Sequence, residues 1–491
     1  MHQSNLRIVK RHTVPVLVDS MATSSLHQVV REGDPTRVQE LLLHHNNSNN
    51  GAILSFLLEE KDERSGQTPL HVASSNGNVE MIELLLNSGA NIEATATATG
   101  LTPMLMSCMM GHYDASRLLL DRGAHIEAKS TSKGATPLHL VCMEGKIRLA
   151  ELLLNRGAYI EALTVDGTTP LHVAACFGQS GIVQLLLQRG ANIRALSNNG
   201  TALLHMVCME GKTRLAERFL DRGANIEVAT QDGNTSLHIA ASFGQLEIVQ
   251  LLLRRGANLE SRSNTGTTPL HHAAGYGQLE ILKLLLDAGA DIETRTHLGF
   301  TPLHAACKAN HKHIVEELLH RRANMIAIDG EGWMPFHIAC LHGWTDLICL
   351  LLDRFPDHYR EGEQHTVGLK HHMLLEAKDN MGRSPLDLAC LCGLVEVVQL
   401  LLDRGATVET KPNGEMTPLC HAASRDHAEV VWLLVRRYPW LLERRSPPPV
   451  APKTKRRRNG AYSALSNVFS KIRTTRKSTT RGRKFLKWGK F

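Results

Sequence analysis

Aromatic residues make up only 4% of this 491-residue chain, which argues against a core of large aromatic side chains. No apolar run approaches the roughly 18 residues that a membrane-spanning helix needs. The first twenty residues have no continuous apolar core, so they are a poor secretory signal. They also lack acidic residues before Asp19, which is a weak feature of organelle-targeting peptides. We expect residues 1–23 to form a disordered leader instead.

A disulfide framework is also missing, because only ten cysteines are spread over the chain. Seven of them occupy nearly the same place in a recurring pattern, which favours small buried side chains. These are Cys108, Cys142, Cys176, Cys208, Cys307, Cys340 and Cys390. No Cys or His group has the ligand spacing of a zinc site, and we predict neither a metal nor a cofactor. The cysteine usage indicates a reducing compartment, which is the cytoplasm, the nucleus or both.

The chain does contain a repeated motif. Thr-Pro-Leu-His stands at residues 68–71, 136–139, 169–172, 268–271 and 301–304, and variants extend the series to 417–420. The motif ends at positions 71, 105, 139, 172, 205, 238, 271, 304 and 337, which are 34, 34 and then 33 residues apart. The same hexapeptide, VCMEGK, occurs at 141–146 and 207–212, two periods apart. This regular period predicts a stack of similar structural units.

Each period predicts two helices. In "IVQLLL" the apolar residues return every three or four places, as they do on one face of a helix. The motif Pro suits the first turn of the first helix, and the Thr before it can cap that helix. A glycine such as Gly190 or Gly256 ends the second helix.

The motif, the period and segments such as "GANIEA" resemble the ankyrin-repeat family. The resemblance implies an all-α solenoid of about twelve helix-turn-helix-hairpin units over residues 24–442, with insertions near 44–62 and 355–377. Such insertions often map to a binding face, although a simple spacer explains both. The resemblance also implies that the motif histidines hydrogen-bond within their turns and between units. They are His27, His71, His139, His172, His205, His238, His271, His304 and His337.

No convincing catalytic signature accompanies the repeats. Residues 130–133 fit a Ser-x-x-Lys pattern, but so short a match in a hairpin loop is expected by chance. The resemblance implies a non-enzymatic, monomeric scaffold or adaptor that holds partner proteins on a concave surface. Two alternatives stay open: a substrate-receptor subunit of a ubiquitin ligase, and a membrane-associated adaptor. The basic C-terminal segment does not look like a ligase-recruiting box.

The fourth and fifth residues after the motif His fall at the exposed end of the first helix, where ankyrin repeats usually have polar residues. Here they are mostly apolar, although Lys308 and Ala309 interrupt the series. The candidate partner-binding residues are Met109, Met110, Met143, Phe177, Met209, Phe243, Tyr276 and Leu341. Aligned side by side, they would form an apolar stripe that binds an extended peptide or an amphipathic helix. The alternative is that they pack against neighbouring helices.

A row of glutamates occupies the hairpin position that is hydroxylated on asparagine in many ankyrin repeats. It consists of Glu93, Glu127, Glu161, Glu227, Glu260, Glu293 and Glu409. The glutamates argue against that modification, and we expect a solvated acidic edge.

The C-terminal segment differs sharply from the repeats. Residues 443–491 contain sixteen Lys and Arg against one acidic residue, so they carry +15 and residues 1–442 carry −8 of the total of +7. The candidate residues for localisation or for an anionic partner are Lys453, Lys455, Arg456, Arg457, Arg458, Lys484, Lys487 and Trp488. Nuclear import, binding to an anionic membrane surface, and nonspecific nucleic-acid binding all fit them. A disordered, solvated tail fits them as well.

Overall fold

The computed structural model describes residues 26–47, 51–358, 372–408 and 416–442. The predictions for the leader, for the basic C-terminal residues and for Glu409 lie outside these residues. The described chain divides into two compact units. Unit 1 contains the residues up to 210 together with 218–224, and unit 2 contains 211–217 and the residues from 225 onward.

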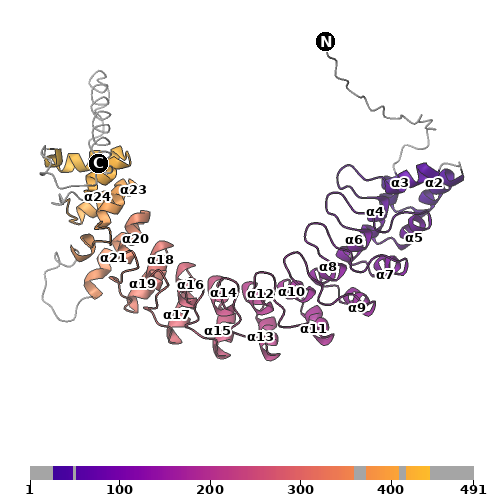
Figure 1. Cartoon of the computed structure of the whole chain (residues 1–491), viewed down its shortest axis with the longest axis horizontal. Coiled ribbons are helices and arrows are strands. Elements are labelled where there is room, and N and C mark those ends of the chain that lie inside the picture. The colour runs from indigo at the N-terminus through magenta and orange to yellow at the C-terminus, as the bar shows by residue number, and fades with distance from the viewer. Residues whose placement is uncertain (1–25, 48–50, 359–371, 409–415, 443–491) are drawn as a thin grey trace, which may run out of the picture. The chain divides into compact units, whose positions relative to one another are not determined.

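In unit 1 the helices form two layers, because first helices pack on first helices and second helices on second helices (Figure 1). The first helices are α1 (Leu26–Glu32), α4 (Pro69–Asn76), α6 (Pro103–Met110), α8 (Pro137–Glu144), α10 (Pro170–Cys176) and α12 (Leu203–Met209). The second helices are α2 (Pro35–Asn47), α5 (Val79–Asn87), α7 (Tyr113–Asp121), α9 (Ile147–Asn155) and α11 (Ser180–Gln188). A further helix, α3 (Gly51–Glu59), lies in the first predicted insertion.

Unit 2 is built in the same way. Its first helices are α14 (Ser236–Ser242), α16 (Pro269–Gly275), α18 (Pro302–Lys308), α20 (Pro335–His342), α23 (Pro385–Cys392) and α25 (Pro418–Ser424). Its second helices are α15 (Leu246–Arg254), α17 (Leu279–Asp287), α19 (Lys312–His320), α21 (Thr345–His358), α24 (Val395–Asp403) and α26 (Ala428–Arg437), followed by the 3-10 turn η1 (Pro439–Leu442). Helix α13 (Thr213–Asp221) contains residues of both units.

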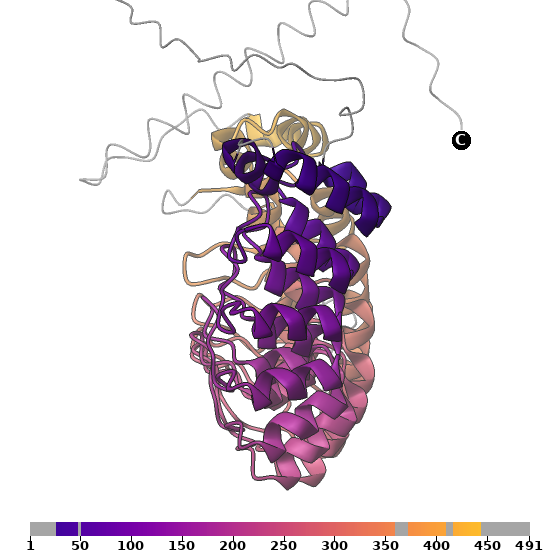
Figure 2. The same ribbon diagram turned by 90° about the vertical axis from the view of Figure 1, so that its right-hand side faces the viewer.

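Twelve helix pairs in the described residues confirm the predicted all-α repeat architecture. The loops that join the repeats leave the helices at one edge of each unit (Figure 2). Only isolated β-bridges were found among the described loops, between Leu196 and Ala202 in unit 1 and between Ala229 and Thr235 in unit 2. The sequence period did not reveal the division into two units.

The hydrophobic core lies between the two layers and between neighbouring repeats. In α15, Ile248, Val249 and Leu252 are buried while Gln250 is exposed, so the three- and four-residue spacing turns one face inward. In repeats that keep the full motif, the Thr precedes the first helix in extended conformation and the Pro occupies its first turn, as predicted for α4, α8 and α18. Six of the seven aligned cysteines are buried, and Cys176 is half-buried.

The motif histidines join consecutive repeats. In His139, Nδ1 accepts the backbone N–H of Thr136 at 3.2 Å, and Nε2 lies 3.1 Å from the carbonyl oxygen of Thr168 in the next repeat. An amide N–H can only donate and a carbonyl can only accept, so the ring is neutral with its proton on Nε2. His271 repeats this arrangement in unit 2, between Thr268 and the carbonyl of Phe300. The bond from Nε2 to a carbonyl of the next repeat is also made by His27, His71, His238, His304 and His337, which confirms the predicted role for them, whereas Nε2 of His172 has no hydrogen-bond partner.

Burial lowers the pKa of these imidazoles, because it disfavours the charged form. The pKa of His139, His172 and His271 falls to about 4. The Nε2–H bond to a carbonyl offsets this for His139 and His271 only in part. These three histidines therefore stay uncharged at neutral pH.

The glutamate row is more than the solvated edge that the sequence suggested. The Glu93 carboxylate accepts the backbone N–H of His125 at 2.7 Å, and Glu293 accepts that of Asn324 at 2.7 Å. The same bond is made by Glu127, Glu161, Glu227 and Glu260 to Tyr159, Asn192, Asn258 and Asp291. Each carboxylate thus ties its own loop to the next one through a charge-assisted hydrogen bond.

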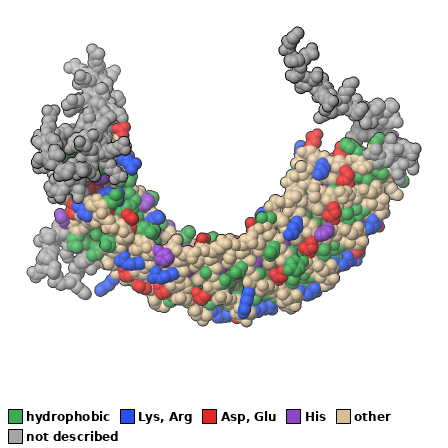
Figure 3. Space-filling view, in the orientation of Figure 1, with side chains coloured by type: hydrophobic (Ala, Val, Ile, Leu, Met, Phe, Trp, Pro, Cys, Tyr) green, Lys and Arg blue, Asp and Glu red, His purple; other side chains and the backbone are tan. Residues whose placement is uncertain are grey.

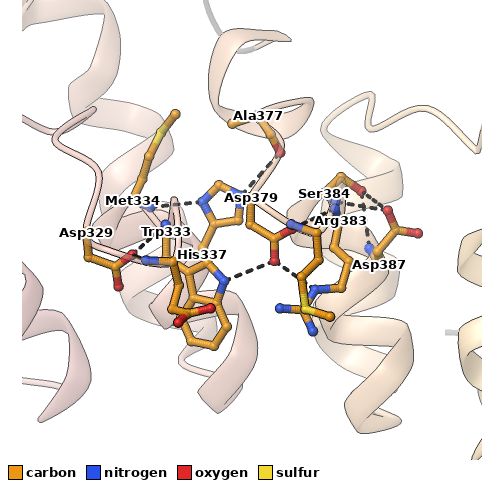
Figure 4. A network of polar contacts seen from close by, with 11 residues as sticks. Asp329, Trp333, Met334, His337, Ala377, Asp379, Arg383, Ser384 and Asp387 are labelled. Carbon is orange, nitrogen blue, oxygen red and sulfur yellow. Dashed lines mark hydrogen bonds and ion pairs between the residues drawn. The ribbon is translucent and has the colours of Figure 1, made fainter. Parts of the chain in front are cut away.

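The repeats on either side of the second insertion stack directly on each other. Figure 4 shows the indole Nε1 of Trp333 donating to Asp379 at 3.0 Å, while the Arg383 guanidinium donates to the same carboxylate at 2.7 Å. Burial alone would raise the pKa of Asp379, but the bonds from Arg383 and Trp333 lower it overall. On the second-helix layer, Arg404 reaches Asp353 at 3.2 Å. The insertion therefore leaves the stack unbroken.

In the repeat that follows the second insertion, a carboxylate replaces the motif histidine. Asp387 accepts the backbone N–H of Ser384 at 2.9 Å, as the histidine ring does elsewhere. The Asp387 side chain is too short to reach a carbonyl of the next repeat, as an imidazole does elsewhere. It nevertheless caps the start of α23 in the same way as the histidines cap their helices. The predicted insertion near 355–377 begins later in the structure, because α21 continues through Phe355, which is buried.

Candidate partner-binding site

The surface of the first-helix layer that points away from the second helices is called the first-helix face below. The residues five places after the motif His lie on it, at the ends of the first helices. The exposed fractions of Met110 and Phe177 in unit 1 are 48% and 53%, and those of Phe243 and Tyr276 in unit 2 are 54% and 62%. Hydrophobic side chains reach the surface of both units among charged ones (Figure 3). These four residues are therefore available to a partner.

The apolar candidates four places after the motif position are half-buried, whereas Lys308 at the same place is exposed. Met109 and Met143 pack against a cluster of Leu101, Leu105, Met106 and Leu140. Met209 and Leu341 are half-buried as well. The two interpretations of the stripe, partner binding and packing, thus apply to different positions. The apolar residues at the fifth place are exposed, and those at the fourth place mainly pack against neighbouring side chains. Partner binding itself stays a prediction.

The backbone of the stripe is held by the following repeat. Two residues after the exposed position, a polar side chain reaches back to the carbonyl of the half-buried position. Gln179 donates to Met143 at 3.1 Å, and His311 to Gly275 at 3.1 Å. His112, Gln278 and His427 make the same bond to Ser75, Ser242 and Leu391. The exposed side chains therefore stand on a fixed backbone, which lowers the entropic cost of binding.

Unit 2 also has an aromatic surface that the sequence did not reveal. Phe300 and Trp333 are half-buried at the bases of two loops, next to first helices. The ammonium of Lys308 lies 5.8 Å from the Phe300 ring centre, and the Tyr276 ring lies 6.1 Å from that of His272. Lys308 was seen in the sequence only as a break in the apolar series. An alignment of the repeats that compared the residue four places after the motif His with the residue four places before that His could have paired Lys308 with Phe300.

The histidines and cysteines of the described residues are not assembled into a metal site. The described residues contain no group of three His, Cys, Asp or Glu side chains placed to hold a metal ion. The rings of His311 and His313 lie 5.8 Å apart, and each instead bonds a backbone carbonyl. Burial raises the pKa of the Cys108 thiol to about 12, so it is inert as a nucleophile. Within the described residues, no helix is both long and apolar enough to cross a bilayer.

The comparison with protein families gives the class of this chain. The model described as ankyrin repeats (3 copies) matches residues 26–130, 127–197, 204–296, 293–361, 327–412 and 368–439. These matches cover most of the chain, so it belongs to the ankyrin-repeat family. Ankyrin repeats serve in general as modules for binding other proteins.

A curated relative agrees with this assignment over a short segment. The chain is 35% identical over 74 residues to the putative ankyrin repeat protein FPV240 of Fowlpox virus (strain NVSL). The aligned segment is 15% of this chain and 16% of the viral protein. The chain therefore spans only a small part of that relative's length.

Proposed function

We propose that this chain is a non-enzymatic adaptor that binds partner proteins through the first-helix faces of its two units. The observation that supports this is the row of exposed apolar side chains at one repeat position: Met110, Phe177, Phe243 and Tyr276. Glu144 and Glu210 occupy this position in the two intervening repeats of unit 1, whereas Phe243 and Tyr276 stand in consecutive repeats of unit 2. Exposed apolar surface is a common mark of interaction sites, and aromatic residues often dominate binding energy.

The test replaces Met110, Phe177, Phe243 and Tyr276 together by Ser. Their exposure predicts that capture of partners by proximity labelling is lost while the thermal unfolding midpoint barely moves. Met143 and Met209 are left in place because they are half-buried. As a matched control, Leu163, Val165, Leu196 and Leu298 are changed to Ser, since they are exposed apolar residues of the loops between repeats and not of the first helices. Unchanged capture in the first variant would remove the proposal.

We further propose that the basic segment from residue 443 directs where the adaptor resides: in the cytoplasm, in the nucleus or at an anionic membrane surface. Its charge of +15 supports this. Deleting residues 452–458, which contain Lys453 and Arg456, should reduce the nuclear signal of a fluorescent fusion. Deleting 482–491, which contain Lys484, Lys487 and Trp488, should reduce a membrane signal. If neither deletion changes the distribution, the segment has no such role.

A further inference from the structure

We infer that the first-helix face of unit 2 selects acidic peptides in extended conformation. This inference rests on the proposed function and adds the chemistry of the partner. It starts from the residue that breaks the apolar series, Lys308, whose side chain lies over the ring of Phe300 on this face.

The charges on this face all have one sign at the positions that define the stripe. At the fourth and fifth places after each motif position, unit 2 carries the cations Lys308 and Arg425, and both are exposed. The other residues at these places are Ser242, Phe243, Gly275, Tyr276, Ala309, Leu341, His342, Leu391, Cys392 and Ser424, so none is acidic. The same places in unit 1 carry three acidic residues, Glu32, Glu144 and Glu210, and one cation, Arg31.

The nearby carboxylates of unit 2 do not neutralise Lys308. Among the described residues no carboxylate forms an ion pair with it, and its recorded contact is the Phe300 ring. Asp329 and Asp379 are buried, and both accept backbone N–H groups in their own loops. Arg383 is engaged by Asp379. Lys308 is therefore a cation with an aromatic neighbour, open to an anionic group from outside.

The spacing of the repeats sets the pattern of the peptide. Neighbouring packed helices lie about 8–10 Å apart, and an extended chain in the polyproline II conformation rises about 3.1 Å per residue and turns once every three residues. Equivalent positions in successive repeats therefore match peptide side chains three residues apart, which lie on the same side of such a chain. Phe243 and Tyr276 would contact two apolar side chains at this spacing, and Lys308, one place before the equivalent position of the next repeat, would meet an Asp or Glu about three residues further on.

The experiment pans a random linear peptide library displayed on phage against the full-length chain. Peptides that depend on Tyr276 should be enriched in Asp and Glu, with apolar residues three places apart. Lys308→Glu should weaken their binding by about fivefold or more, because an attraction becomes a repulsion. Lys308→Met should weaken it less, and added salt should do the same. Lys283→Glu is the matched control: it makes the same charge change on α17, away from this face.

The outcomes separate this inference from the proposed function. If peptides bind through Tyr276 without an acidic preference, or are insensitive to Lys308→Glu, the adaptor function stands and the acidic partner is wrong. If no enriched peptide depends on Tyr276 or on the other exposed residues of the stripe, both fall. Single-stranded DNA and phosphatidylserine vesicles are tested alongside. Binding of either through Lys308, with no peptide doing so, would replace the peptide by another anionic ligand and overturn the inference.

Discussion

The first-helix faces of unit 1 and unit 2 use the same repeat positions for different chemistry. Unit 1 presents methionines, Phe177 and three glutamates, whereas unit 2 presents Phe243, Tyr276 and basic residues. Methionine is flexible and adapts to irregular surfaces, while aromatic rings offer rigid anchors. The buried positions of the two units are nearly interchangeable. The comparison shows that the fold is fixed by the interior of each repeat, which leaves its exposed end free to vary.

Acidification should cause the largest loss of folding stability, and it should destabilise both units alike, because both contain buried neutral imidazoles. The pKa of His139, His172 and His271 is about 4 in the folded chain, against about 6.5 in the unfolded chain. As the pH falls below 6.5, the unfolded chain takes up protons first. The stability is therefore complete above about pH 6.5 and declines towards pH 4, by about 2 kcal/mol per such histidine at pH 5.

Urea unfolding followed by circular dichroism at pH 7 and pH 5 measures this effect. A midpoint that stays constant between the two values would contradict the role given to the histidines. Few exposed carboxylates titrate in that interval, so it isolates the imidazoles.

Single substitutions test whether the two units share their interior but not their surface. His139→Ala and His271→Ala should each lower the free energy of unfolding by about 3 kcal/mol, because each leaves a buried carbonyl and amide without their partner. Met110→Ser and Tyr276→Ser should each change it by less than about 0.5 kcal/mol. Denaturant unfolding of the four variants gives these values. If a surface substitution lowered the free energy of unfolding as much as the buried substitution in the same unit, the proposed difference between the interior and the exposed end of a repeat would be wrong.

The smallest predicted effect is a gain in unit 2. Arg322 has φ +66°, in a place where α15 and α17 are followed by Gly256 and Gly289 at φ +81° and +95°. A left-handed backbone is strained for a residue with a Cβ atom, so Arg322→Gly should stabilise the chain by about 1 kcal/mol. Gly256→Ala is the control and should cost a similar amount. Loss of stability in Arg322→Gly would show that the arginine side chain contributes more than the strain removes.

The helix pairs were predictable from local patterns that return every 33 or 34 residues, and the role of the motif histidines was predictable from the resemblance to ankyrin repeats. The bonds between loops were not. A glutamate such as Glu293 looks solvated until the loop of the next repeat brings the N–H of Asn324 within 2.7 Å. The same is true of Trp333 and Asp379, which are 46 residues apart in the sequence and lie in repeats that stack on each other. The contact of Lys308 with the Phe300 ring was not predicted either, because Phe300 belongs to the preceding loop.

Each hydrogen bond from a motif histidine to the next repeat fixes the imidazole proton on Nε2, and this tautomer has a characteristic spectroscopic signal. The nitrogen chemical shifts of an imidazole distinguish its two tautomers, so a nuclear magnetic resonance spectrum of labelled histidine would show one resonance pattern for each intact bond of this kind. His71 and His304 both hold their Nε2 within 3.0 Å of a neighbouring carbonyl, one in each unit. Transient parting of two repeats would free that proton to exchange with water. The spectrum would then show between which pairs of repeats the chain opens transiently.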